Sequence, residues 1–308
     1  MDTMWNTVTG QYFNTVNTIS AECGRDTLES TLVLCERFEG LLGKMREGSD
    51  VWRLNHAQGE WVLISAHTQR ILSMALAMYE TTDGAFNIAM GKAVNLWHFN
   101  DKKQRVPGRE ELKRALAGAD CGRIEQKGNS ARLPAGMEID LGGIAKGYIA
   151  DEIGAYLREC GVRRAVINLG GNILTIGGKA DGTPWQIGLQ YPVRDRAKRE
   201  KYWGLLHSRD NSIVTSGCYE RGFWRDGTWY HHILDPRSGM PVQNRVLSVT
   251  VRTKDSFLAD AVTTPLLILG EREGMELAER YGVEVVYYLK NNEIVYTRGT
   301  ELMLVREG

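Results

Sequence analysis

Apolar residues recur every three or four positions in two early segments of the chain, Thr27–Met45 and Thr68–Thr81. That spacing places the apolar side chains on one face of a helix, so both segments are predicted to be amphipathic helices. The same reasoning predicts helices over Glu110–Leu116, Ala259–Leu269 and Glu271–Tyr281.

Short extended segments separated by Gly, Asp and Pro are typical of strands. They cover Ala165–Leu169, Trp185–Gln190, Ser212–Thr215, Trp229–Leu234 and Leu247–Arg252. A terminal hairpin is predicted from Val283–Leu289 and Glu293–Thr297 through Asn291-Asn292. Strands and helices mix without a regular βαβ alternation, so the sequence predicts an α+β fold with mixed sheets and flanking helices.

The stretch Met137–Tyr156 predicts the end of a strand, a tight turn at Gly142-Gly143 and then a helix. The first N–H groups of such a helix are unpaired and attract anions, and Lys146 adds a full positive charge. This pattern predicts a seat for a phosphate or diphosphate. An ordinary structural turn is the alternative, because the stretch contains neither a Walker A loop nor the G-x-G-x-x-G fingerprint.

The charge balance argues against one class of function. The 308 residues include 38 Lys and Arg against 38 Asp and Glu, whereas a general nucleic-acid binder needs a basic surface. Hydrophobic residues make up 43%, and no apolar run approaches the roughly 20 residues that cross a bilayer. Five dispersed cysteines without a C-x-x-C pair predict reduced thiols, and no signal-peptide pattern is visible. We therefore expect a cytoplasmic protein that binds neither nucleic acid nor membrane.

Asp260 and Thr264 stand four residues apart, which places a carboxylate and a hydroxyl on one face of a predicted helix. Both are hard oxygen donors of the kind that Mg²⁺ accepts beside water and phosphate oxygens. Taken alone, the pair favours a structural role, with Asp260 near the helix dipole and Thr264 bonded to its own backbone. Pro265 predicts a kink, because proline removes the hydrogen bond to the Ala261 carbonyl. We hypothesise that this freed carbonyl helps to ligate a cation.

His231 and His232 precede the turn residues Asp235-Pro236. Adjacent residues of a strand point to opposite faces, so only one of the two imidazoles serves a given pocket. That histidine is a candidate general base, because its pKa lies near the working pH. A structural role at the turn is the alternative.

Two further segments carry weaker signals. The segment from Thr82 to Trp97 combines small and aromatic residues that suit a planar ring, although core packing explains Phe86 and Trp97 equally well. The run Thr215–Arg221 lacks the G-x-S-x-G pattern of a nucleophile turn, so a serine hydrolase is discounted.

Taken in order, the motifs of the whole chain resemble the ApbE-type FAD:protein FMN transferases. They are Met1-x-Thr-x-Trp, Ser49-Asp-x-x-x-x-Asn55, Asp83-Gly-Ala-Phe-Asn87, Asp140-Leu-Gly-Gly-x-Ala-Lys-Gly, Asn168-Leu-Gly-Gly-Asn172, Thr215-Ser-Gly217, His232-Ile-Leu-Asp-Pro and Ala259-Asp-Ala-x-x-Thr264. The resemblance implies one ApbE-like, T-fold-like domain over residues 1–308, and two sub-lobes with the FAD site between them remain an option. It also implies that FAD is bound with Mg²⁺, with Mn²⁺ as the alternative.

The resemblance further implies a reaction and a set of residues. FMN passes from FAD to a Thr or Ser hydroxyl of an acceptor flavoprotein, AMP leaves, and a phosphoester remains. The implied FAD contacts are Met1, Asn55, Ala85, Phe86, Asn87, Asp140, Lys146 and Leu234, and the implied metal ligands are the Gly143 carbonyl, Asp260 and Thr264. With Lys146 and Asp260 at the diphosphate, His232 is the candidate for taking the hydroxyl proton. A Mg²⁺-dependent FAD pyrophosphatase and a non-catalytic flavin carrier are the alternatives.

Overall fold

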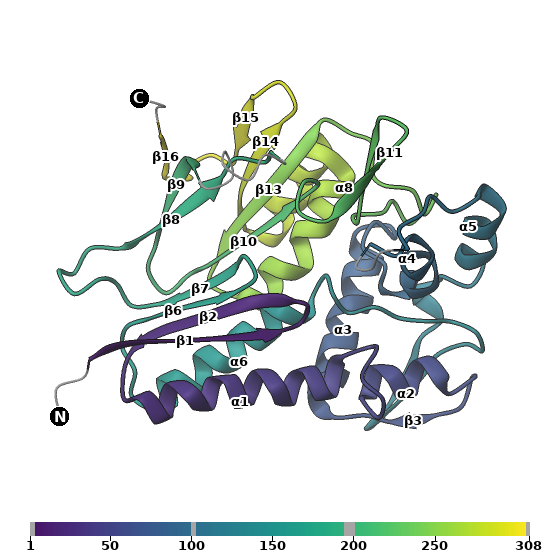
Figure 1. Ribbon diagram of the computed structural model, residues 1–308, viewed down its shortest axis with the longest axis horizontal. Coiled ribbons are helices and arrows are strands. Elements are labelled where there is room, and N and C mark those ends of the chain that lie inside the picture. The colour runs from purple at the N-terminus through teal and green to yellow at the C-terminus, as the bar shows by residue number, and fades with distance from the viewer. Residues whose placement is uncertain (1–3, 100–102, 194–200, 306–308) are drawn as a thin grey trace.

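The computed structural model describes residues 4–99, 103–193 and 201–305, and it confirms the α+β class (Figure 1). The largest sheet has eight strands in the order β1-β2-β6-β7-β10-β13-β14-β15, and every neighbouring pair is antiparallel. Its strands are β1 (Trp5–Tyr12), β2 (Thr15–Glu22), β6 (Ala165–Leu169), β7 (Asn172–Ile176), β10 (Ser212–Gly217), β13 (Val246–Thr253), β14 (Glu284–Leu289) and β15 (Ile294–Tyr296).

The described residues also form three smaller sheets. They comprise β3 (Val62–Leu63), β5 (Ser130–Arg132) and β4 (Glu125–Lys127); β16 (Leu302–Leu304), β9 (Tyr202–Ser208) and β8 (Trp185–Gln190); and the hairpin of β11 (Gly222–Arg225) and β12 (Thr228–His231). The predicted hairpin near the end of the chain forms as β14 and β15. It is not the last element, because β16 follows it and pairs with β9.

Among the described residues, the helices are α1 (Arg25–Leu42), α2 (Asp50–His56), α3 (Ala66–Thr81), α4 (Gly91–Trp97), α5 (Arg109–Leu116), α6 (Ala145–Glu159) and α8 (Ser256–Tyr281), with short 3-10 turns η1 (Ile88–Met90) and η2 (Cys121–Arg123). Helices α1, α6 and α8 contact strands of the large sheet (Figure 1). Helix α1 buries Leu28, Cys35, Phe38 and Leu42, which recur at the three- and four-residue spacing of one helix face. The predicted amphipathic helix is thereby confirmed.

The main core lies between the large sheet and these helices, and a separate cluster forms around Trp97. Trp97 is fully buried, and its Nε1 donates to the Gly239 carbonyl at 3.0 Å. Of the two roles that the sequence left open for Trp97, core packing is therefore the one observed. Phe223 and Leu234 belong to the same cluster, which joins the segment after β12 to α4.

Two observations concern the cysteines and the length of the helices. All five cysteines are free thiols, and Cys35 and Cys121 are fully buried. Burial raises the pKa of each of these two thiols to about 12. Within the described ranges, no helix combines the length and the apolar character of a membrane span.

Candidate functional site

The Asn55 side chain and the backbone at Ile88, and not a neighbouring strand of a sheet, hold the segment that leads into α6. Asn55 Nδ2 donates to the Ile139 carbonyl at 3.0 Å, and the Ile139 N–H donates back to Asn55 Oδ1 at 2.8 Å. The next N–H, of Asp140, donates to the Ile88 carbonyl at 2.8 Å. The segment belongs to none of the sheets, so the prediction of a strand before the Gly-Gly turn is wrong. The Asn55 amide satisfies the backbone groups that a neighbouring strand would otherwise pair.

Two N–H groups that were expected to face an anion are paired within the protein. The Gly142 N–H donates to Asp140 Oδ1 at 2.8 Å, and the Gly147 N–H donates to Asp260 Oδ2 at 2.8 Å. The prediction that the N–H groups at this helix start are unpaired is therefore wrong for Gly142 and Gly147. The positive charge at this helix start comes from the Lys146 side chain.

Lys146 and Asp260 meet where α6 crosses α8. Lys146 Nζ lies 3.7 Å from Asp260 Oδ1 and donates to the Gly142 carbonyl at 3.3 Å. Asp260 is buried. The two helices approach so closely that a Cβ on Gly147 would lie 2.2 Å from the Ser256 carbonyl oxygen. A glycine at position 147 is therefore what allows Lys146 and Asp260 to meet.

Gly143 and Thr264 are neighbours at the same crossing. A Cβ on Gly143 would lie 3.5 Å from Thr264 Oγ1 and 3.6 Å from the Phe86 ring. Asp260 and Thr264 both lie in α8, one helical turn apart, as predicted. Of the implied metal ligands, Gly143 and Thr264 are thus neighbours, and Asp260 lies one turn away from Thr264 in α8.

These oxygens are too few to enclose a metal ion by themselves, but they suit Mg²⁺, which keeps ligands from water and substrate. Across the described ranges, no group of three or more His, Cys, Asp or Glu side chains is placed to hold a metal ion. Mg²⁺ is usually bound by one or two carboxylates together with substrate phosphates and water. Asp260 is the one carboxylate among the implied ligands; its Oδ2 accepts from the Gly147 N–H, and its Oδ1 lies on the side of Lys146.

Helix α8 breaks at a different residue from the one predicted. Its backbone is helical through Pro265, and the non-helical residue is Gly270, with φ 83° and ψ −179°. The predicted kink at Pro265 is therefore wrong, and the hypothesis of a metal-ligating Ala261 carbonyl is withdrawn with it. Glycine is the residue that tolerates a positive φ, so the bend falls where the backbone has most freedom.

Lys44 is a charged neighbour of Asp140 that the sequence did not reveal. Its Nζ donates to Asp140 Oδ2 at 2.7 Å and to Asn95 Oδ1 at 2.9 Å. Burial alone would raise the pKa of Asp140, but the Lys44 ammonium, the Gly142 N–H and the charge of Arg221 hold it below its usual value. Asp140 is therefore an anion near neutral pH.

His232 sits at the base of the β11–β12 hairpin. Its N–H donates to the Arg221 carbonyl at 3.1 Å, and its Nδ1 lies 3.2 Å from the same oxygen. Burial lowers the pKa of His232 to about 3, and the charges of Arg221, His231 and Lys146 add to this effect. His231, one residue earlier, is buried with its Nε2 3.2 Å from the Val242 carbonyl. As the strand argument predicted, the two imidazoles face different surroundings.

The other implied FAD contacts lie on several different elements. Phe86 is buried, Ala85 is half-buried beside it, and Asn87 caps η1 with its side chain. Leu234 is buried in the cluster around Trp97. Met1 lies outside the described residues.

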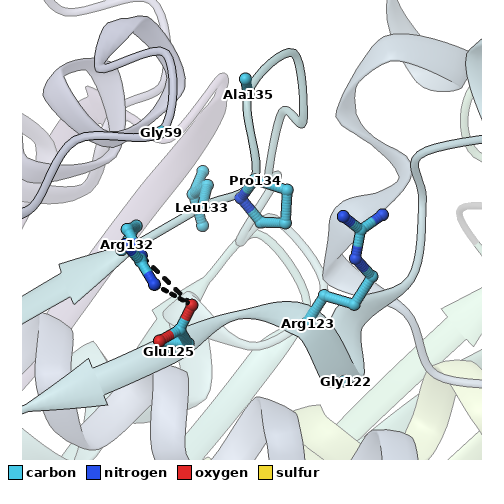
Figure 2. Close-up of a pocket in the computed structure, with 8 residues that line it drawn as sticks. All are labelled: Gly59, Gly122, Arg123, Glu125, Arg132, Leu133, Pro134 and Ala135. Atoms are coloured by element: carbon cyan, nitrogen blue, oxygen red, sulfur yellow. Dashed lines mark hydrogen bonds and ion pairs between the residues drawn. The ribbon is translucent and has the colours of Figure 1, made fainter.

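A cavity of about 500 Å³ lies elsewhere, beside the small β3-β5-β4 sheet (Figure 2). Its lining residues are Gly59, Gly122, Arg123, Glu125, Arg132, Leu133, Pro134 and Ala135. Figure 2 shows Glu125 bonded to Arg132 on one side of the cavity and Arg123 on the other. None of the residues proposed from sequence lines this cavity, so it is separate from the α6–α8 crossing.

Known proteins resemble the chain over nearly its whole length. The model of the ApbE family matches residues 1–287. A FAD:protein FMN transferase of Klebsiella pneumoniae (strain 342) is 39% identical over 267 residues, covering 85% of this chain and 82% of the relative. The corresponding protein of Vibrio cholerae serotype O1 is 34% identical over 265 residues, covering 84% of this chain and 78% of the relative.

Solved structures agree with these relatives. The ApbE protein of Thermotoga maritima superposes with a TM-score of 0.87 at 30% identity, covering 96% of this chain and 97% of the other. The flavin transferase ApbE of Vibrio cholerae gives a TM-score of 0.83 at 29% identity, with the same coverage of 96% and 97%.

Proposed function

This chain belongs to the ApbE family, and on that basis we propose that it is a flavin transferase that moves FMN from FAD to a Thr or Ser hydroxyl of an acceptor flavoprotein. The observation that carries the proposal is the meeting of Lys146, Asp260 and Thr264 where α6 crosses α8. Breaking a diphosphate requires its negative charge to be neutralised and its phosphorus to be held in place. Lys146, together with a cation that the oxygens of Asp260 and Thr264 would hold, would supply both.

In the proposed reaction, the acceptor hydroxyl oxygen bonds to the FMN phosphorus while the bond from that phosphorus to the bridging oxygen breaks. AMP leaves with the bridging oxygen. The hydroxyl proton passes to His232 Nε2. Because a carbonyl oxygen only accepts, the contact with the Arg221 carbonyl requires the hydrogen on Nδ1, and this leaves the Nε2 lone pair free to take a proton. The negative charge of a bound diphosphate raises the pKa of this imidazole toward the working range.

The remaining groups bind and orient FAD in this proposal. Lys146 pairs with the diphosphate, and Asp260 Oδ1, Thr264 Oγ1 and the Gly143 carbonyl would hold Mg²⁺ or, alternatively, Mn²⁺. When bound, the metal neutralises charge as the phosphorus–oxygen bond breaks. The proposed FAD contacts outside this crossing are Met1, Asn55, Ala85, Phe86, Asn87, Asp140 and Leu234. We further propose that residues 1–308 form one domain, and that it works in the cytoplasm, where its five thiols stay reduced.

Incubation of the enzyme with FAD, Mg²⁺ and a candidate acceptor tests the reaction. The expected result is an acceptor whose intact mass increases by one FMN less one water, with one AMP released per acceptor. Free FMN and AMP in equal amounts with an unmodified acceptor would identify a pyrophosphatase. FAD recovered unchanged would identify a carrier. Removal of the metal with EDTA should stop FMN transfer, and added Mg²⁺ should restore it.

A matched pair of threonines tests the metal ligands. Thr264→Val removes the hydroxyl next to Gly143, so we expect the Mg²⁺ concentration for half-maximal transfer to rise at least tenfold. Thr263→Val is the control, because the Thr263 hydroxyl donates to the Asp260 carbonyl inside α8 and not to the site. Equal metal requirements for the two variants would contradict the assignment of Thr264.

A further inference from the structure

The β11–β12 hairpin places the Arg221 side chain beside His232. Gly222 pairs with His231 across the two strands, and the His232 N–H donates to the Arg221 carbonyl at 3.1 Å, so the pairing continues by one more residue on each strand. Residues that pair directly across two antiparallel strands lie on the same face, with their Cβ atoms about 5 Å apart. The side chains of Arg221 and of His232, the proposed base, therefore extend from the same face of the hairpin.

The charge of Arg221 also acts on a second group of the site, which comes from a different part of the chain. Burial has the largest effect on both groups, raising the pKa of Asp140 and lowering that of His232, and the charge of Arg221 lowers both pKa values. A Coulomb interaction weakens with distance, so the Arg221 charge lies in the neighbourhood of both side chains. Arg221 therefore belongs to the site that holds Asp140 and His232.

Lys44, Lys146 and Arg221 differ in their partners. Lys44 donates to Asp140, and Lys146 lies 3.7 Å from Asp260. Arg221 is half-buried, and within the described ranges its guanidinium forms no ion pair and no hydrogen bond. These five side chains together carry one positive charge in excess. Because a charge that is partly removed from water is costly without a partner of opposite charge, the arrangement indicates an anionic ligand beside Arg221.

The position of Arg221 selects the part of the anion that it meets. In the proposed reaction His232 takes the proton of the acceptor hydroxyl, and the oxygen of that hydroxyl bonds to the FMN phosphorus. In an in-line displacement the AMP phosphate leaves on the opposite side of this phosphorus. A cation beside His232 is therefore near the oxygens that stay on the FMN phosphorus. The planar N–H groups of a guanidinium suit such oxygens, because they can bind two of them at once.

We propose that the Arg221 guanidinium binds the non-bridging oxygens of the FMN phosphate of FAD and stabilises their charge as the acceptor hydroxyl attacks. This inference rests on the proposed function and adds a catalytic residue to it. Arg221 makes and breaks no covalent bond, because its contribution is electrostatic. The bonds that form and break are those of the proposed transfer, and the hydroxyl proton still passes to His232.

Steady-state kinetics with an acceptor that the wild-type enzyme modifies test this inference. Arg221→Ala should lower kcat at saturating FAD, Mg²⁺ and acceptor by about a hundredfold or more. Arg221→Lys should recover part of the loss, because it restores the charge without the planar N–H groups. Guanidinium ions, added to Arg221→Ala below the concentration that unfolds it, should also restore part of the rate. Arg225→Ala is the matched control and should keep the wild-type kcat, because Arg225 is exposed and lies four residues nearer the turn of the same hairpin.

The outcomes separate this inference from the proposed function. A wild-type enzyme that modifies no acceptor refutes the function and, with it, the role of Arg221. If the wild-type enzyme transfers FMN and Arg221→Ala keeps its kcat, only the role of Arg221 is refuted. A loss that neither Arg221→Lys nor guanidinium reduces would identify a structural effect of the substitution. A rise in the KM for the acceptor at unchanged kcat would place Arg221 on the acceptor protein. Each of the last two results also overturns the inference.

Discussion

Replacing Gly147 by alanine should damage stability and catalysis through a single crowded contact. The new Cβ would lie 2.2 Å from the Ser256 carbonyl oxygen and 2.6 Å from Asp260 Cβ. Carbon and oxygen rarely approach closer than about 3.3 Å, so α6 and α8 must separate by roughly 1 Å. That separation weakens the Gly147 N–H bond to the Asp260 carboxylate and moves Lys146 away from Asp260.

The expected loss of stability can be assembled from three terms. Overpacking costs about 1–3 kcal/mol, and loss of a hydrogen bond to a charged group costs about 1.5–3 kcal/mol. The higher helix propensity of alanine returns about 1 kcal/mol. The free energy of unfolding should therefore fall by about 1.5–5 kcal/mol, which is measured by urea denaturation. Because a typical domain has about 5–15 kcal/mol of stability, the variant still folds, and its transfer rate can be assayed.

Gly154→Ala on the same helix is the matched control. There the new Cβ would lie 2.8 Å from Leu174 Cδ2 and 3.2 Å from Arg158 Nη1, both at the ends of flexible side chains that can move. The gain in helix propensity should offset this adjustment, so the free energy of unfolding should change by less than about 1 kcal/mol. If both alanine variants lose the same stability, or if Gly147→Ala transfers FMN at the wild-type rate, the argument that glycine sets the α6–α8 distance is refuted.

Three further variants test other parts of the structure. Lys44→Met leaves the half-buried Asp140 anion without its cation, so the free energy of unfolding, measured with urea, should fall by about 2–4 kcal/mol at pH 7. This loss should be smaller below the usual pKa of a carboxyl group, where Asp140 takes up a proton. Burial, with the charge of Asp255 adding to it, raises the pKa of Asp151 to about 7. A raised carboxyl pKa contributes stability at low pH that is lost as the pH rises from about 4 to 7. Asp151→Asn should therefore flatten the dependence of the free energy of unfolding on pH over that window, and an unchanged slope would contradict this. Asn55→Ala removes both hydrogen bonds to the segment before α6 and should cost about 1–3 kcal/mol, with faster amide exchange there as the readout.

The local pattern of apolar and polar residues predicted a helix or strand correctly where that element is defined by its own side chains. Strands β6 and β8 have the bounds that the sequence predicted, Ala165–Leu169 and Trp185–Gln190, and α3 and α5 begin within two residues of their predicted starts. The Asp260–Thr264 pair belongs to the same category, because helical period alone places the two oxygens one turn apart. These features depend only on neighbours within one turn of helix or one strand.

Prediction from the sequence failed where the backbone forms its hydrogen bonds with groups that are distant in the chain. The segment before α6 looks like a strand, but its hydrogen bonds go to Asn55 and Ile88 instead of to a ladder. The β1–β2 hairpin was missed because its turn, Phe13-Asn14, has φ of 57° and 56° without any glycine to mark it. Pro265 was expected to bend α8, and Gly270 bends it instead.

The sequence by itself determined the fold class, the position of most helices and strands, and an ordered set of motifs that identified the family. Only the tertiary structure decided that Lys44 neutralises Asp140 across 96 positions, that Gly147 brings Lys146 against Asp260, and that Arg221 orients His232. The physical reason is that periodicity acts between near neighbours, whereas the choice among distant partners depends on how the whole chain packs its core.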